Sequence, residues 1–61
     1  MKTVRVDFST TVRGGLVRAN TARASEPLEV GDEVLAYDPS EDMEYEATVQ
    51  VLEGRFAYLA M

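Results

Sequence analysis

The feature that most constrains this chain is a period-two alternation of apolar and polar residues, repeated in short runs between turn-forming residues. The first run spans Thr3 to Phe8 and the clearest one spans Tyr45 to Val51. Such alternation is typical of strands that bury one face and expose the other. No run has a convincing helical spacing, so we expect the chain to fold as β-sheet.

Glycine marks the first turn. Gly14 and Gly15 stand where a tight hairpin turn needs positive φ, which glycine adopts at no steric cost. The return strand is expected to begin at Leu16. A turn of this length sets Val17 opposite Val12.

The segment after this hairpin is ambiguous, because residues 19–25 suit a fading strand, a helical turn or a loop. Glu26–Pro27 then interrupts any helix, since proline lacks a backbone donor and restricts the residue before it. Three further turns are expected at residues 31–32, 38–42 and 53–54. The last two separate the three strands of a meander.

Five short strands predict an all-β domain over residues 1–61, because closure into a barrel protects strand edges that would otherwise aggregate. We expect a small antiparallel SH3-like barrel made of an N-terminal hairpin and a three-stranded meander. The alternative is a split sheet with a short helix over residues 17–25. The expected core comprises Val4, Val6, Phe8, Val17, Val30, Val34, Ala36, Ala47, Val49, Val51 and Phe56.

Composition argues against an enzyme. The 61 residues include no cysteine and no histidine, which leaves no disulfide, no thiolate metal site and no imidazole base. Paired carboxylates catalyse only in a cleft that separates their pKa values, and a barrel this small rarely encloses one. We therefore expect no enzymatic activity, no catalytic residues, no metal and no cofactor. The alternating start and the lack of a long apolar run predict a cytoplasmic protein.

Charge is divided unevenly along the chain. Residues 1–25 carry five basic residues and one acidic residue, whereas residues 26–61 carry one basic residue and ten acidic residues. The simplest interpretation is attraction between two parts of one fold. Nucleic acid is a less expected partner, which would be bound through phosphate contacts of Arg5, Arg13, Arg18 and Arg23.

The acidic half allows two further hypotheses. Glu41, Asp42, Glu44 and Glu46 could imitate a phosphate backbone and inhibit a basic partner. Alternatively, two copies could pair through an edge strand, with the acidic half of one against the basic half of the other, which predicts a salt-sensitive homodimer.

One stretch, residues 31–49, is more particular than simple alternation. Gly31–Asp32 opens a strand that contains Ala36, a polar turn follows, and Tyr45-Glu46-Ala47-Thr48-Val49 returns. This arrangement resembles a Tudor-type barrel. The resemblance implies an aromatic cage for methylated lysine or arginine, in which Tyr45 matches one position. Asp38 stands where the family has another aromatic residue.

The interpretation favoured by the sequence is a non-enzymatic protein-binding or regulatory accessory module. Exposed aromatic residues flanked by charge are typical interface anchors. The expected partner contacts are Leu35, Tyr37, Asp38, Glu44, Tyr45 and Tyr58.

Overall fold

The computed structural model describes residues 1–12 and 14–61, with the side chains of residues 9–12 outside that description. Over this part the chain forms five strands and no helix, which confirms the expected all-β class. The strands are β1 (Lys2–Val12), β2 (Leu16–Ala24), β3 (Glu33–Asp38), β4 (Met43–Glu53) and β5 (Phe56–Ala60). The ambiguous residues 19–24 therefore belong to a strand.

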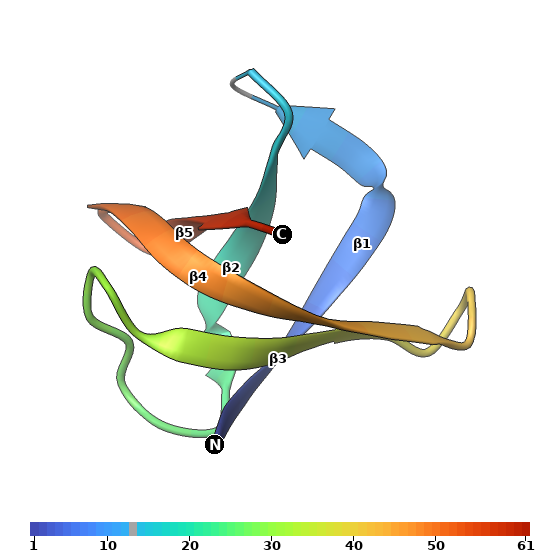
Figure 1. Ribbon diagram of the computed structural model, residues 1–61, viewed down its shortest axis with the longest axis horizontal. Coiled ribbons are helices and arrows are strands. Elements are labelled where there is room, and N and C mark those ends of the chain that lie inside the picture. Colours follow the sequence, from blue (N-terminus) through green and yellow to red (C-terminus); the bar gives the residue numbers. More distant parts are fainter. Residues whose placement is uncertain (13) are drawn as a thin grey trace.

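The strands close into a barrel in the order β1-β2-β5-β4-β3, which is compatible with an SH3-like barrel (Figure 1). The hairpin β1–β2 and the meander β3–β4–β5 are both present, as expected. The purely antiparallel arrangement was wrong at one pairing, because β1 and β3 are parallel. Residues 25–32 carry the chain across one end of the barrel, so β3 starts beside the start of β1 and runs in the same direction.

The register of the β1–β2 hairpin differs from the expected one. Val17 pairs with Thr11 rather than Val12, and the pairing shifts again before Ala19 meets Val6. Within the shifted part of β1, the Phe8 N–H donates to Asp38 Oδ2 at 3.1 Å, a side-chain contact outside the β1–β2 pairing. Strand β1 bends sharply in this region, as Figure 1 shows.

The core fills the barrel with small and medium-sized side chains. Its buried residues are Val4, Val6, Val17, Ala19, Leu28, Val34, Ala36, Ala47, Val49, Ala57 and Leu59. Three expectations about the core were wrong. Val51 is only half-buried and lies outside the core cluster, after a register irregularity between Val49 and Val51 in β4. Val30 is 62% exposed beside the turn at Gly31, and Leu28 is buried instead. On β5 the interior residues are Ala57 and Leu59, while the expected core residue Phe56 packs outside this cluster.

The connection from β2 to β3 is tied to β1 by polar contacts. Lys2 Nζ donates to Asp32 Oδ2 at 2.7 Å and to the Pro27 carbonyl at 2.6 Å. The hydrogen bond with Asp32 raises the pKa of Lys2, and the same bond lowers the pKa of Asp32. These contacts fix the start of β1 beside β3. Within the described residues, nothing helical is long and apolar enough to cross a membrane.

Candidate functional site

The outer surface of β1 and β2 carries arginines because both strands alternate. Arg5 lies between buried Val4 and Val6, and Arg18 lies between buried Val17 and Ala19. Alternation therefore directs both guanidinium groups to solvent on the outside of the barrel. Arg23 is also exposed, near the end of β2.

A bulge in β2 brings Arg23 to the same side. Val4 pairs with Ala24 and Val6 with Ala19, so β2 has more residues than β1 between these pairs. The bulge is held by Asn20 Oδ1, which accepts the Ala22 N–H at 2.9 Å. Extra residues in one strand redirect side chains locally.

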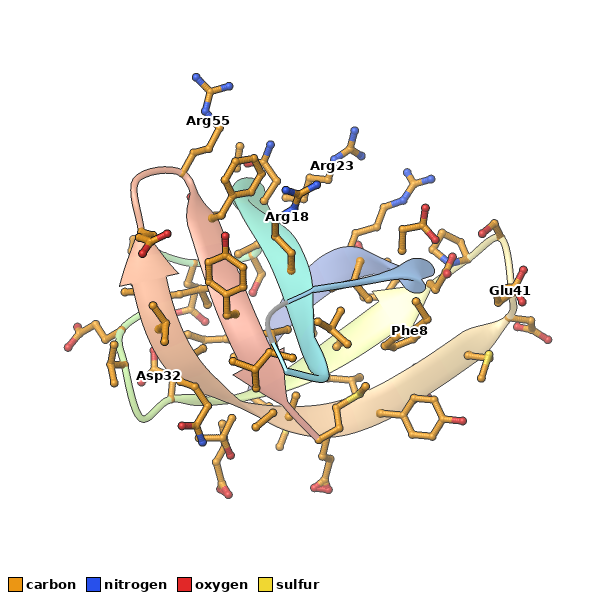
Figure 2. All side chains as sticks on the ribbon, turned by 90° about the horizontal axis from the view of Figure 1, so that it is seen from above. Phe8, Arg18, Arg23, Asp32, Glu41 and Arg55 are labelled. Atoms are coloured by element: carbon orange, nitrogen blue, oxygen red, sulfur yellow. The ribbon has the colours of Figure 1, made fainter. Side chains whose placement is uncertain are left out.

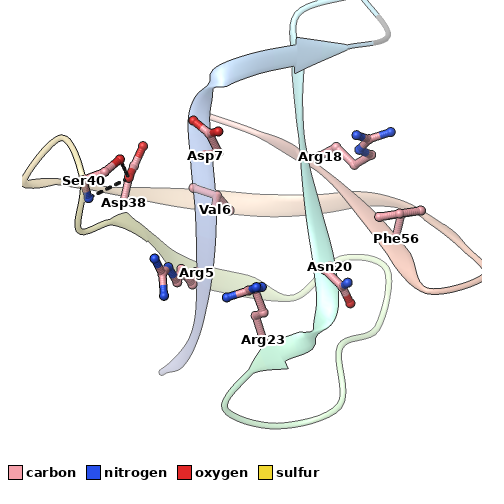
Figure 3. A pocket seen from close by; sticks show the side chains of 9 residues that line it. All are labelled: Arg5, Val6, Asp7, Arg18, Asn20, Arg23, Asp38, Ser40 and Phe56. Atoms are coloured by element: carbon pink, nitrogen blue, oxygen red, sulfur yellow. Dashed lines mark hydrogen bonds between the residues drawn. The ribbon is translucent and has the colours of Figure 1, made fainter.

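These arginines line one groove of about 390 Å³ across β1 and β2. Figure 3 shows Arg5 on one side of β1, Arg23 between the two strands and Arg18 beyond β2. The full lining is Arg5, Val6, Asp7, Arg18, Asn20, Arg23, Asp38, Ser40 and Phe56. We call this surface the arginine groove.

Arg18 rests on an aromatic ring at one end of the arginine groove. Its guanidinium carbon lies 4.7 Å from the centroid of the Phe56 ring, which is a cation–π distance. Phe56 is half-buried and is the register partner of Asn20. The ring therefore supports the charged end of Arg18 while leaving that residue exposed.

Asp38 lies at the opposite end of the groove, where its carboxylate already accepts hydrogen bonds from the protein itself. It is 2% exposed, and its carboxylate accepts the Phe8 N–H, the Ser40 N–H and the Ser40 hydroxyl. The Ser40 bonds contribute most to lowering the pKa of Asp38, with further help from the backbone N–H of Phe8. Asp38 thus organises the start of the β3–β4 turn, and its charge is compensated by donors.

Charge on the described surface is segregated. Figure 2 shows Arg18, Arg23 and Arg55 on one side of the barrel, with Asp32 on another side and Glu41 on the β3–β4 turn. Arg55 lies on the turn between β4 and β5, outside the lining of the arginine groove. Asp7 lies within the lining and reduces its positive charge.

The structure separates the residues expected to contact a protein partner. Leu35, Tyr37 and Glu44 share the outer face of β3 and β4, where Tyr37 pairs with Glu44. Tyr45 packs edge-on against Phe8, with ring centroids 5.4 Å apart and planes at 81°. Asp38 is buried, and Tyr58 is only 7% exposed, so neither is the exposed anchor that was expected.

The structure brings together most of the arginines that were expected to contact nucleic acid. Of the four arginines expected to contact nucleic acid, the structure gathers Arg5, Arg18 and Arg23 in one groove, while Arg13 lies outside the described residues. Sequence reasoning missed Asn20 and Phe56 as groove residues. A correct register would have found them, because they pair with each other beside Arg18.

The acidic residues do not converge into a metal site. No group of three or more carboxylates among the described residues could hold a metal ion. Glu41, Asp42, Glu44 and Glu46 are exposed along the β3–β4 turn and the start of β4.

Comparison of the chain with protein-family models, with curated proteins and with solved structures finds no match. The geometry of the surface is therefore the basis for assigning a function.

Proposed function

We propose that this protein is a non-enzymatic binding module, that its binding surface is the arginine groove and that its partner is a polyanion. The observation that carries the proposal is the gathering of Arg5, Arg18 and Arg23 in one groove, in a chain whose net charge is −5. Like charges repel, and the lining carboxylates offset only part of the charge of the three arginines, so a bound anion would relieve the remaining repulsion. Guanidinium groups suit phosphate because they offer paired donors in a plane.

The spread of the cations favours an extended partner over a single small anion. Figure 3 places the three arginines on both sides of β1 and β2 rather than around one point. An extended chain of phosphates can contact each in turn, and every contact releases counterions.

Single arginine variants test this proposal. Arg23→Ala removes a groove cation and should weaken binding of inorganic polyphosphate about ten-fold, the usual effect of losing one charge-assisted hydrogen bond. Arg55→Ala is the matched control, because it removes the same charge outside the groove, and it should change the affinity less than about two-fold. Calorimetric titration measures both. Equal weakening by both variants would show that net charge, and not the groove, determines binding.

A protein partner at the outer face of β3 and β4 is the second candidate. It is favoured by half-buried Leu35 and Tyr37, which stand beside the exposed Glu44 and Glu46 of β4. The Tudor-type resemblance of residues 31–49 supports the same candidate, because it implies recognition of a modified protein side chain in this part of the chain.

Affinity capture from a nuclease-treated lysate tests this second candidate. A protein bound at the β3–β4 face should survive nuclease and high salt, and it should be lost with Leu35→Glu. Retention by Leu35→Glu would exclude this face.

A further inference from the structure

An aromatic and arginine row crosses the outside of the barrel beside the arginine groove. Tyr37 of β3 pairs with Arg5 of β1, and Phe56 of β5 pairs with Asn20 of β2. The pairing of Val6 with Ala19 links these two pairs. Arg5 precedes Val6 on β1 and Asn20 follows Ala19 on β2, so Arg5 and Asn20 lie next to each other on adjoining strands. Four neighbouring strands thus present Tyr37, Arg5, Asn20 and Phe56 in sequence; we call this the outer row.

We infer that the polyanion bound at the arginine groove is a single-stranded nucleic acid whose bases stack along the outer row. This inference rests on the proposed function and adds the chemical class of the partner. Phosphate contacts require cations alone, whereas bases also need flat surfaces that aromatic rings and guanidinium planes provide.

The Arg18–Phe56 contact provides one stacking surface. Arg18 is exposed, and its guanidinium carbon lies over the half-buried Phe56 ring, so the group is supported by an aromatic surface while the side chain stays open to solvent. A base can stack on the solvent side of a guanidinium plane. Tyr37 is half-buried on the outer face of β3 and provides an aromatic ring at the far end of the outer row.

The length of the outer row suits a short stretch of nucleotides. Neighbouring strands lie about 4.8 Å apart, so three steps from Tyr37 to Phe56 span about 14 Å of sheet. Nucleotides in a duplex advance about 3.4 Å each, and a strand whose bases are separated is more extended, so the outer row accommodates fewer than about four nucleotides. Bases in a duplex are stacked on one another and cannot reach these side chains.

Arg18→Lys separates stacking from charge, because lysine keeps the charge but has no planar group. Competition against a labelled eight-nucleotide oligothymidine measures the affinity for three ligands. They are unlabelled oligothymidine, inorganic polyphosphate of equal charge and a duplex of equal length. The wild-type protein should bind oligothymidine at least ten-fold more tightly than polyphosphate or duplex. Arg18→Lys should lower the affinity for oligothymidine about ten-fold and change the affinity for polyphosphate less than about two-fold.

Tyr37→Leu is the second variant, because it removes a ring without changing the charge. It should reproduce the selective loss of oligothymidine, and an unchanged amide NMR spectrum away from β3 should confirm that the barrel is intact. Equal affinity of the wild type for all three ligands, or equal weakening of oligothymidine and polyphosphate by Arg18→Lys, would overturn the inference while leaving polyanion binding in place. Failure of every polyanion to bind would overturn the proposed function as well.

Discussion

Leu59 is fully buried inside the barrel, whereas Leu52 on the adjoining strand is 36% exposed. Leu59→Ala should lower the free energy of unfolding by about 2–5 kcal/mol, because it removes buried methyl groups and leaves a cavity. Leu52→Ala should cost less than about 1 kcal/mol, since a partly exposed side chain loses less buried area. Urea denaturation measures both. Equal losses would contradict the assigned interior face of the strands.

The Asp38 carboxylate makes the stability of the folded protein depend on pH. The donors at Ser40 and Phe8 lower its pKa in the folded protein below the ordinary value near 3.8. A lowered folded pKa means that this stabilisation is fully present above the unfolded pKa and is lost as pH falls through the folded pKa. We therefore expect the melting temperature to fall steeply below about pH 4.

Asp38→Asn provides the control for that acid titration. The amide cannot titrate, so the variant should be less stable at neutral pH and should lose less of its remaining stability on acidification. Asp32 also has a lowered pKa and titrates in both proteins, so it leaves a residual acid dependence. An identical acid profile in the variant and the wild type would show that Asp38 does not contribute.

Several single residues lie beyond what alternation can predict. The pattern places Tyr58 and Phe56 on one face of β5 correctly, but it does not say which face is inside. The interior takes Ala57 and Leu59, because space inside a small barrel is narrow, and the Phe56 ring packs outside the core cluster beneath Arg18. The burial of Asp38 is equally hard to predict from sequence, since one of its donors, the Phe8 N–H, lies thirty residues away along the chain.

At the scale of elements, the β1–β2 hairpin depends on backbone conformation. Gly14 has a φ of +62°, and a Cβ added there would meet nothing within 4 Å. Gly14→Val should destabilise the protein by about 1–2 kcal/mol through backbone strain alone. Gly14→Asn should cost less, because asparagine adopts this conformation more readily. Thermal unfolding tests this order, and equal effects of the two substitutions would contradict it.

The elements themselves were largely predictable, whereas one register was not. Glycine, proline and aspartate mark the turns, and alternation marks the strands, so the hairpin and meander follow from local signals. The β1–β2 register depends on the bend at Phe8 and the bulge near Asn20, both of which need distant partners or a local side-chain bond. The parallel β1–β3 pair depends on the path of residues 25–32 across the barrel end.

Across the whole molecule, the basic and acidic halves of the sequence lie on different parts of the barrel. The basic half of the chain forms β1 and β2, which carry the arginine groove, and the acidic half includes the β3–β4 turn with Glu41 (Figure 2). The arginines could be named from sequence, but their convergence required the barrel register.

Because the two charges lie on different parts of the surface, two copies could attract each other, and the homodimer stays a prediction. If the acidic turn of one copy contacts the arginine groove of another, sedimentation should show association at low salt and monomers above about 0.5 M salt, where charges are screened. Arg18→Ala should weaken the association. A monomer at low salt would contradict this prediction and leave the groove open to a polyanion.

The salt dependence of polyanion binding shows whether the arginine groove is the binding surface. For single-stranded oligothymidine, three phosphate contacts predict that log K falls with log salt at a slope of about −2. A variant with Arg5, Arg18 and Arg23 all replaced by alanine should lose most of this slope and of the affinity, whereas Arg55→Ala should keep both. Salt-independent binding by the wild type, or an unchanged slope in the triple variant, would contradict the assignment of the arginine groove.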